Sequence, residues 1–191
     1  LCNIHLLNAN RRVSHLKEQQ VFRFGWNPRS LNKHIFDVVA FMHDGLRIAY
    51  TVKPEVFLHR SSKRRGKDGR ILDNRSFLEK MGEIAWWAVE ETRTYDDVRL
   101  ITNADINQVD LRNAEIYARV READPVALAE ARRVVADLPD GGGKSLRDLT
   151  LDAGADPQVY RALLHLMRKG ELRCIAHEII TPKSIVIRTD C

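Results

Sequence analysis

The sequence predicts an α/β fold with a mixed sheet, and three observations support this. Two apolar runs, residues 34–42 and 46–53, flank the turn signal His43-Asp44-Gly45 and are typical of a β-hairpin. Residues 73–93 repeat apolar side chains at helical spacing. Residues 98–102 are short, β-branched and apolar, as in a further strand. A hairpin, a helix and another strand in this order predict a mixed sheet flanked by helices.

The remaining segments before residue 140 also predict strands and helices. Residues 18–24 alternate polar and apolar side chains and predict a strand before the hairpin. The helix over 73–93 is expected to begin with Asp73 or Asn74 as its N-cap. Residues 105–137 read as helical, with Pro125 starting a fresh helix.

Composition excludes some classes of protein. The chain has 191 residues, 44% hydrophobic and 30% charged, which is enough for a sizeable core. No apolar run approaches the roughly 18 residues of a membrane span, so no membrane partner is expected. Three scattered cysteines without a CxxC spacing favour reduced thiols and a cytoplasmic location. The chain begins with Leu1, from which a trimmed N-terminus is expected.

The last third of the chain predicts a second domain. The glycine run at 139–144 is expected to be a linker, which gives domains at 1–106 and 145–191 and a helical connector at 107–144. Ser145 with Asp148 resembles a capping box, and Asp156-Pro157 an N-cap and N1 pair for a second helix ending at Gly170. Two helices followed by the strand-like runs 171–176 and 184–189 predict a small winged helix.

Basic residues gather in two places. The stretch 60–70 is rich in cations and predicts a DNA-binding loop, or simply a solvated one; its cations are Arg60, Lys63, Arg64, Arg65, Lys67 and Arg70. On the second helix of the C-terminal segment, a polar face for DNA or a partner protein is predicted from Arg161, His165, Arg168 and Lys169. The opposite face, with Val159, Leu163, Leu166 and Met167, is expected to be buried.

Asp37 and Lys53 are the charged exceptions within the apolar hairpin runs. A two-residue turn would place Asp37 and Lys53 on opposite faces of the sheet, because side chains alternate along a strand. A three-residue loop of His43, Asp44 and Gly45, with a G1 bulge, instead places Asp37 opposite Thr51 with Lys53 diagonal. The alternatives for the charged pair are a functional site on one face, a structural ion pair, or a lysine extending to solvent at a strand end.

The order of these segments resembles that of the TnsA family of transposon endonucleases. The stretches that carry the resemblance are VSHLKEQQVFRF, HIFDVVAFMHDGLRIAYTVKP, VRLITNADI and LRNAEIYARV, followed by the winged helix. The resemblance implies a PD-(D/E)xK nuclease domain, similar to restriction endonucleases, that hydrolyses phosphodiester bonds with Mg²⁺ or Mn²⁺ at transposon ends. It also implies DNA, a transposase subunit and an ATPase regulator as partners.

By that resemblance Asp37 binds the metal, Thr51 takes the middle position of the E/Q-x-K motif and Lys53 takes its lysine. In such chemistry a carboxylate-held cation polarises the phosphate and activates water. Two features depart from the family. Thr51 offers a hydroxyl where the family has an acid or amide, and the family's upstream glutamate is not found, so it either precedes Leu1 or is absent.

These departures leave two further readings open. In one, the chain is a catalytically inactive DNA-binding or assembly module that keeps the nuclease fold. In the other, it is a winged-helix transcription regulator, which leaves the sheet domain without a role. Glu83 or Glu90 on the predicted long helix is a candidate substitute acid, and His34 a candidate for helping to hold a metal or phosphate, although strict alternation places His34 on the face opposite Asp37.

Overall fold

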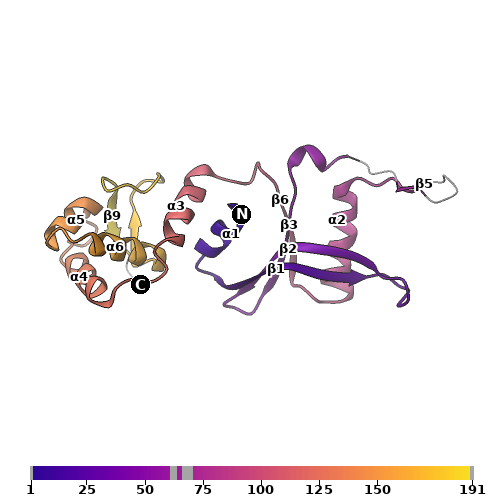
Figure 1. The fold of residues 1–191 in the computed structure, drawn as a ribbon, viewed down its shortest axis with the longest axis horizontal. Helices are drawn as coiled ribbons and strands as arrows, with labels where there is room; N and C mark the ends of the chain where they lie inside the picture. Colours follow the sequence, from indigo (N-terminus) through magenta and orange to yellow (C-terminus); the bar gives the residue numbers. More distant parts are fainter. Residues whose placement is uncertain (1, 61–63, 66–70, 190–191) are drawn as a thin grey trace. The chain divides into compact units, whose positions relative to one another are not determined.

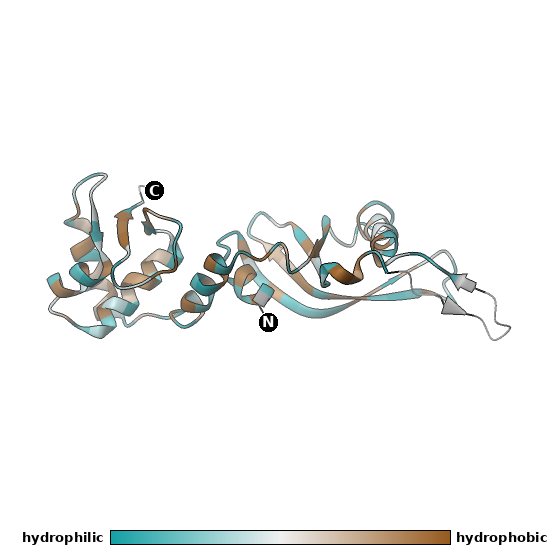
Figure 2. Cartoon of the chain, turned by 90° about the horizontal axis from the view of Figure 1, so that it is seen from above, coloured by the Kyte–Doolittle hydropathy of each residue, from teal (hydrophilic) through white to brown (hydrophobic). Residues whose placement is uncertain are grey.

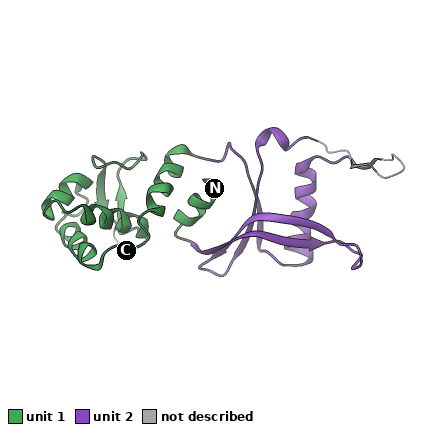
Figure 3. Ribbon diagram, in the orientation of Figure 1, with its two compact units in different colours: residues 1–11, 107–191 green, residues 12–106 purple. Residues whose placement is uncertain are grey.

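The chain is a mixed α/β protein in a computed structural model, which describes residues 2–60, 64–65 and 71–189. It divides into two compact units, shown in two colours in Figure 3. Residues 12–106 form one, here called the sheet unit, and residues 1–11 with 107–191 form the other, here called the terminal unit. The segment expected as a connector, 107–144, therefore folds together with 145–191, and so do the first eleven residues.

The sheet unit contains a four-stranded mixed sheet in the order β1-β2-β3-β6 (Figure 1). Strands β1 (Val13–Phe24), β2 (Asn32–Met42) and β3 (Arg47–Val52) are antiparallel neighbours, and β6 (Asp97–Ile101) runs parallel to β3. A parallel neighbour requires a crossover. That crossover includes the 3₁₀ turn η1 (Glu55–Phe57), the short strands β4 (Arg64–Arg65) and β5 (Ile71–Asp73), and helix α2 (Phe77–Trp86).

Helix α2 covers one face of this sheet and closes its core. Ser76 caps the helix, since its hydroxyl accepts from the Glu79 backbone while the Glu79 carboxylate accepts from the Ser76 backbone. The N-cap is thus Ser76 and not Asp73 or Asn74, because Ser76 is followed by glutamate at the third helical position. Helix α2 continues as a short π-helix, η2 (Trp87–Glu91). The core joins residues of both layers: Phe22, Phe24, Phe36, Val39, Ala49, Met81, Ile84, Trp87 and Ala88.

The terminal unit combines five helices of the described chain with a three-stranded sheet. The helices are α1 (Cys2–Ala9), α3 (Gln108–Ala118), α4 (Pro125–Ala136), α5 (Leu146–Asp152) and α6 (Pro157–Lys169). The sheet has the order β7-β9-β8, with β7 (Gly143–Ser145), β8 (Leu172–Cys174) and β9 (Ile185–Arg188) all antiparallel. The N-caps predicted at Ser145 and Asp156 and the helix end at Gly170 are confirmed.

The core of the terminal unit is built around α6. Val159, Leu163, Leu166 and Met167 of this helix are all buried, as its spacing predicts. Figure 2 shows teal and brown alternating along the helices of this unit, as expected where each helix buries one face. The burial of these apolar side chains, worth roughly 25 cal/mol per Å² of apolar surface, is the main term that stabilises the unit.

The glycine run is part of the terminal unit's sheet and is not simply a linker. Gly143 pairs with Ile187 in the β7-β9 ladder. A Cβ on Gly143 would lie 2.7 Å from the Ile185 side chain, so a larger residue would force β9 away. Glycine is therefore required here for close approach between strands. Within the residues that the structure describes, no helix is both long and apolar enough to cross a membrane.

Candidate functional site

The turn between β2 and β3 is the bulged, three-residue form that a common face requires. Met42 N–H donates to the Leu46 carbonyl at 2.8 Å, and Gly45 N–H donates to the Met42 carbonyl at 3.1 Å. Gly45 has φ +90°, in the left-handed region that favours glycine. The ladder pairs Val38 with Tyr50, so the next residues, Asp37 and Thr51, lie opposite each other. The prediction of a bulged turn is confirmed.

The carboxylate of Asp37 replaces a strand hydrogen bond. Its Oδ2 accepts from the Val52 backbone N–H at 2.7 Å, just beyond the last recorded β2-β3 pair. An unpartnered backbone N–H in a half-buried place costs about 1–3 kcal/mol, so this contact has a structural role of its own. Among the described residues, Oδ1 of Asp37 has no recorded hydrogen bond.

Thr51 is buried and already bonded. Only 4% of its surface is exposed, and its Oγ1 lies 2.9 Å from Nε2 of His34. Burial lowers the pKa of His34, while the nearby charge of Asp37 raises it less. The imidazole is therefore favoured in its neutral form, as a hydrogen-bond partner of the hydroxyl.

His34 lies on the same face as Thr51, contrary to strict alternation along β2. Its ring is 4.7 Å from that of Phe36, which is fully buried in the core beneath α2 together with Val39. Phe36 and Val39 are three residues apart, so the alternation slips by one residue between them. The neighbouring position on β1 is Gln19, whose φ of +52° marks the irregularity. A backbone irregularity of this kind leaves no signal in the sequence.

Lys53 lies in a small pocket beside this face, without an ion pair to Asp37 among the described residues. Its Nζ lies 5.1 Å from the ring centroid of Phe77 and 5.7 Å from that of Phe57, within cation–π range. The guanidinium of Arg60 also lies over the Phe57 ring, 4.7 Å from its centroid. The cavity measures about 230 Å³ and is here called the Lys53 pocket; it is lined by Lys53, Phe57, Arg60, Phe77 and Lys80.

The Lys53 pocket is strongly positive. Among the residues that the structure describes, its lining has three cations and no carboxylate. The nearest acid network is on its rim, where Asp73 contacts Lys80 at 3.2 Å and also binds Arg75. Hydrogen bonds from Arg75 hold the pKa of Asp73 well below its usual range, so Asp73 stays ionised. The sequence analysis did not predict Phe57, Phe77 or Lys80 as site residues. Phe77 and Lys80 lie on a helix and Phe57 in a loop, and neither spacing nor residue type marks them as different from other residues there.

Acidic groups for a metal are scarce on this face. Glu83, expected as a possible substitute acid, binds Arg75 at 2.7 Å. Within the described part of the chain, no three His, Cys, Asp or Glu side chains are grouped to hold a metal. Mg²⁺ prefers several oxygen ligands at near-octahedral geometry. One carboxylate, with the Thr51 hydroxyl already bonded to His34, does not fit that requirement, so these residues alone do not form the implied Mg²⁺ site.

The predicted DNA-binding loop is described only in part. Lys63, Lys67 and Arg70 lie outside the described residues. Arg64 and Arg65 form β4, which pairs with β5, and only their backbone is described. Arg60 lines the Lys53 pocket and is exposed, so it remains available to an anion.

The predicted contact face on α6 has a different role. His165 is only 9% exposed, and its Nδ1 donates to the Val120 carbonyl at 3.0 Å. Arg161 donates to the Arg119 carbonyl at 3.0 Å, and Arg168 to that of Arg121 at 3.4 Å. These three carbonyls belong to the segment directly after α3, which ends at Ala118, so the side chains of α6 bind the backbone where the helix stops. The expectation of a free polar face is wrong for His165, which is buried, whereas Arg161 and Lys169 are exposed.

Three tryptophans cluster at the far end of α2. Trp87 is buried, while Trp86 is 45% and Trp26 75% exposed. The ring centroids of Trp26 and Trp87 are 4.6 Å apart. These are the only tryptophans of the chain. Their fluorescence therefore reports on the sheet unit alone.

Comparison with known proteins finds no similar protein. No protein-family model matches this sequence, and neither curated proteins nor solved structures give a match.

Proposed function

We propose that this chain is a DNA endonuclease subunit resembling the TnsA family, with the phosphodiester bound on the sheet face of Asp37, Thr51 and Lys53. The observation that carries the proposal is the bulged turn, which sets Asp37 opposite Thr51 on neighbouring strands. Strands, crossover helix and parallel β6 are compatible with the restriction-endonuclease-like order, and the helix pair with its three-stranded sheet is compatible with a winged helix.

In this proposal the chain's own part is to bind and orient the phosphodiester. The Lys53 pocket offers Lys53 and Arg60 to a polyanion beside Lys80, which is paired with Asp73, and two phenyl rings hold the Lys53 ammonium in place. Lysine and arginine contacts to phosphates give salt-sensitive affinity for DNA of any sequence. Metal-assisted hydrolysis needs ligands beyond Asp37, and a divalent cation would supply the Lewis acid and the activated water.

A second candidate function is a DNA-binding or assembly module that keeps the nuclease-like fold without cleavage. It is favoured by the engagement of both polar groups: Asp37 supports the Val52 backbone and Thr51 is bonded to His34. Under this proposal Asp37 is a structural residue. A transposase subunit and an ATPase regulator remain the proposed protein partners in both cases, by resemblance alone.

A plasmid assay separates the two candidates. Supercoiled plasmid is incubated with Mg²⁺ or Mn²⁺, with the chain alone and with its transposase partner, comparing wild type with Asp37→Ala. Glu18→Ala is the matched control, since Glu18 is an exposed carboxylate on β1 of the same unit. The endonuclease predicts nicking that is lost in Asp37→Ala and kept in Glu18→Ala.

If no combination nicks the plasmid, the endonuclease proposal fails. Electrophoretic mobility shifts on the same variants then test the second candidate. It predicts that Asp37→Ala binds DNA as wild type does, whereas Arg60→Gln binds more weakly.

A further inference from the structure

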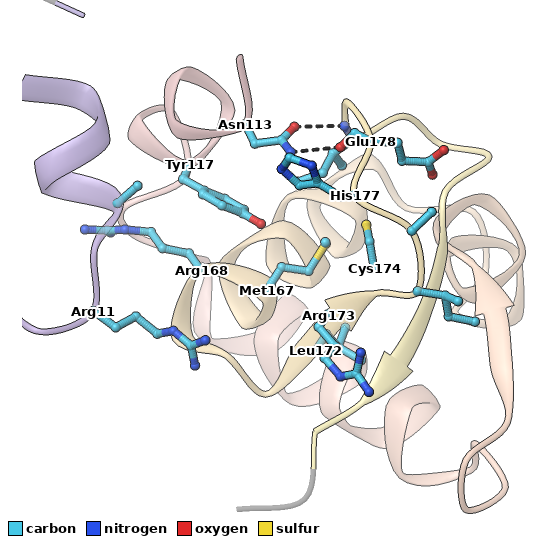
Figure 4. Close-up of a pocket in the computed structure, with 14 residues that line it drawn as sticks. Arg11, Asn113, Tyr117, Met167, Arg168, Leu172, Arg173, Cys174, His177 and Glu178 are labelled. Carbon is cyan, nitrogen blue, oxygen red and sulfur yellow. Dashed lines mark hydrogen bonds between the residues drawn. The ribbon is translucent and has the colours of Figure 1, made fainter. Parts of the chain in front are cut away.

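A second cavity lies within the terminal unit and shares no residue with the Lys53 pocket (Figure 4). It measures about 420 Å³ and is here called the arginine pocket. Its walls come from α3, the end of α6, β8 with the loop that follows, and Arg11 after α1. Sites for small organic ligands typically measure roughly 300–1,000 Å³, so this cavity is large enough for one.

The arginine pocket is rich in positive charge, although one of its arginines, Arg168, already donates to the Arg121 carbonyl. Arg11, Arg168 and Arg173 line it, with Glu178 as the single carboxylate of the lining. Within the described residues, no hydrogen bond or ion pair is recorded for the side chains of Arg11 and Arg173. His177 also lines the cavity, with its Nε2 2.7 Å from Asp110. Three guanidinium groups around one cavity repel one another unless an anion joins them.

The floor of the arginine pocket is apolar. Met167, Leu172 and Ile180 are at least 94% buried and contribute to it. The hydroxyl of Tyr117 points into the cavity in Figure 4. Burial raises the pKa of Tyr117 to about 12, so this hydroxyl is a donor at neutral pH. A positive rim above an apolar floor suits a ligand with an anionic head and an apolar body.

The walls of the cavity are fixed before any ligand binds. Asn113 of α3 accepts from the Ile180 N–H and donates to the Glu178 carbonyl, both at 2.9 Å, which ties the loop after β8 to the helix. Arg11 reaches the cavity over Gly170: a Cβ on Gly170 would lie 1.5 Å from Nη1 of Arg11. A preformed site loses less conformational entropy on binding.

We propose that the arginine pocket binds the phosphate of a nucleotide, with the sugar or base lying on the apolar floor. Guanidinium groups present planar, paired donors that match phosphate oxygens better than ammonium groups do. A phosphate alone would fill only a small part of the cavity. The nucleotide is either a free mononucleotide or one unit of a DNA strand, which share this chemistry.

This inference is independent of the proposed function. Asp37, Thr51 and Lys53 belong to the sheet unit, whereas every residue of the arginine pocket belongs to the terminal unit. Loss of plasmid nicking in Asp37→Ala leaves the arginine pocket intact. The two proposals therefore fail separately.

Calorimetric titration of the full chain tests the inference. The probes are inorganic phosphate, thymidine monophosphate, ATP, a single-stranded oligothymidylate and, for carboxylate chemistry, citrate. The variants are Arg11→Gln and Arg173→Gln. Arg147→Gln is the matched control, because Arg147 is an exposed arginine on α5 of the same unit and does not line the cavity.

We expect a mononucleotide or the oligothymidylate to bind, with roughly tenfold weaker affinity in Arg11→Gln and in Arg173→Gln and no change in Arg147→Gln. Binding of mononucleotides identifies a free nucleotide as the ligand; binding of the oligomer alone identifies a strand. Equal losses in all three variants, equally tight citrate binding, or no binding that depends on Arg11 and Arg173 would each overturn the inference. Thermal melting of each variant confirms that it is folded.

Discussion

The two units use the same kinds of basic side chain in opposite ways. In the sheet unit, Lys53 and Arg60 lie over phenyl rings in a cavity whose described lining residues include no carboxylate. In the terminal unit, Arg161, His165 and Arg168 bind the backbone carbonyls that follow α3. Aromatic rings leave the N–H donors of a cation free for a ligand, whereas carbonyls occupy them. What lies opposite a cation therefore decides whether it belongs to a site or to the fold.

His165 gives the largest effect that tests this comparison. We expect His165→Ala to lower the free energy of unfolding of the terminal unit by about 2 kcal/mol, because it opens a buried space and leaves the Val120 carbonyl without its donor. Urea unfolding followed by far-ultraviolet circular dichroism measures this. Lys169→Ala is the matched control on the same helix, and its effect should stay within about 0.5 kcal/mol. Equal effects of the two variants would show that His165 is a surface residue.

Asp37 tests the structural side of the sheet unit. We expect Asp37→Ala to destabilise this unit by about 1–2 kcal/mol, since the Val52 N–H loses its acceptor. Asp37→Asn keeps an oxygen in that place and should cost less than half as much. Urea unfolding followed by tryptophan fluorescence is the measurement, because all three tryptophans lie in this unit. Equal costs for alanine and asparagine would contradict the hydrogen-bond role.

Replacing His34 has a smaller effect on the stability of the sheet unit, and this effect depends on pH. Burial holds its folded pKa below the ordinary 6.5, so the unfolded state binds the proton more readily. Its contribution to stability is therefore complete above about pH 6.5 and declines as the pH falls from there toward the lowered pKa. We expect the stability of the sheet unit to drop less between about pH 7.5 and about pH 5.5 in His34→Gln than in wild type.

The fluorescence-detected unfolding used for Asp37 serves again here. An identical pH dependence in the two proteins would mean that the His34 imidazole titrates normally and is not held neutral against Thr51.

Lys53 gives the smallest effect on stability and a distinct one on binding. We expect Lys53→Met to change the free energy of unfolding by less than about 0.5 kcal/mol, because methionine keeps the packing on Phe77. DNA affinity should fall, and the slope of its logarithm against that of salt concentration should become shallower by about 1. Fluorescence anisotropy with labelled DNA measures both. An unchanged slope would remove Lys53 from the DNA-binding surface.

Much of the fold can be predicted from local sequence patterns. Residues 34–42 and 46–53 gave the hairpin, and Gly45 gave its bulged turn, because turn geometry depends on a few neighbouring residues. The caps at Ser145 and Asp156 are equally local. The site was predicted in part: Asp37 and Thr51 lie opposite each other on neighbouring strands as predicted. His34 reaches Thr51 because the side-chain alternation of β2 changes between Phe36 and Val39, beside Gln19.

The sequence by itself therefore determined the main strands and helices of both units and the hairpin register, since these follow from periodicity and turn chemistry over short spans. Only the tertiary structure decided which polar groups are free. Residues 1–11 fold with 107–191, α6 meets the end of α3, and two phenyl rings surround Lys53. These are contacts between segments far apart in the chain, and hydrophobic burial, which drives such contacts, is non-directional, so no local pattern specifies the partners of a side chain.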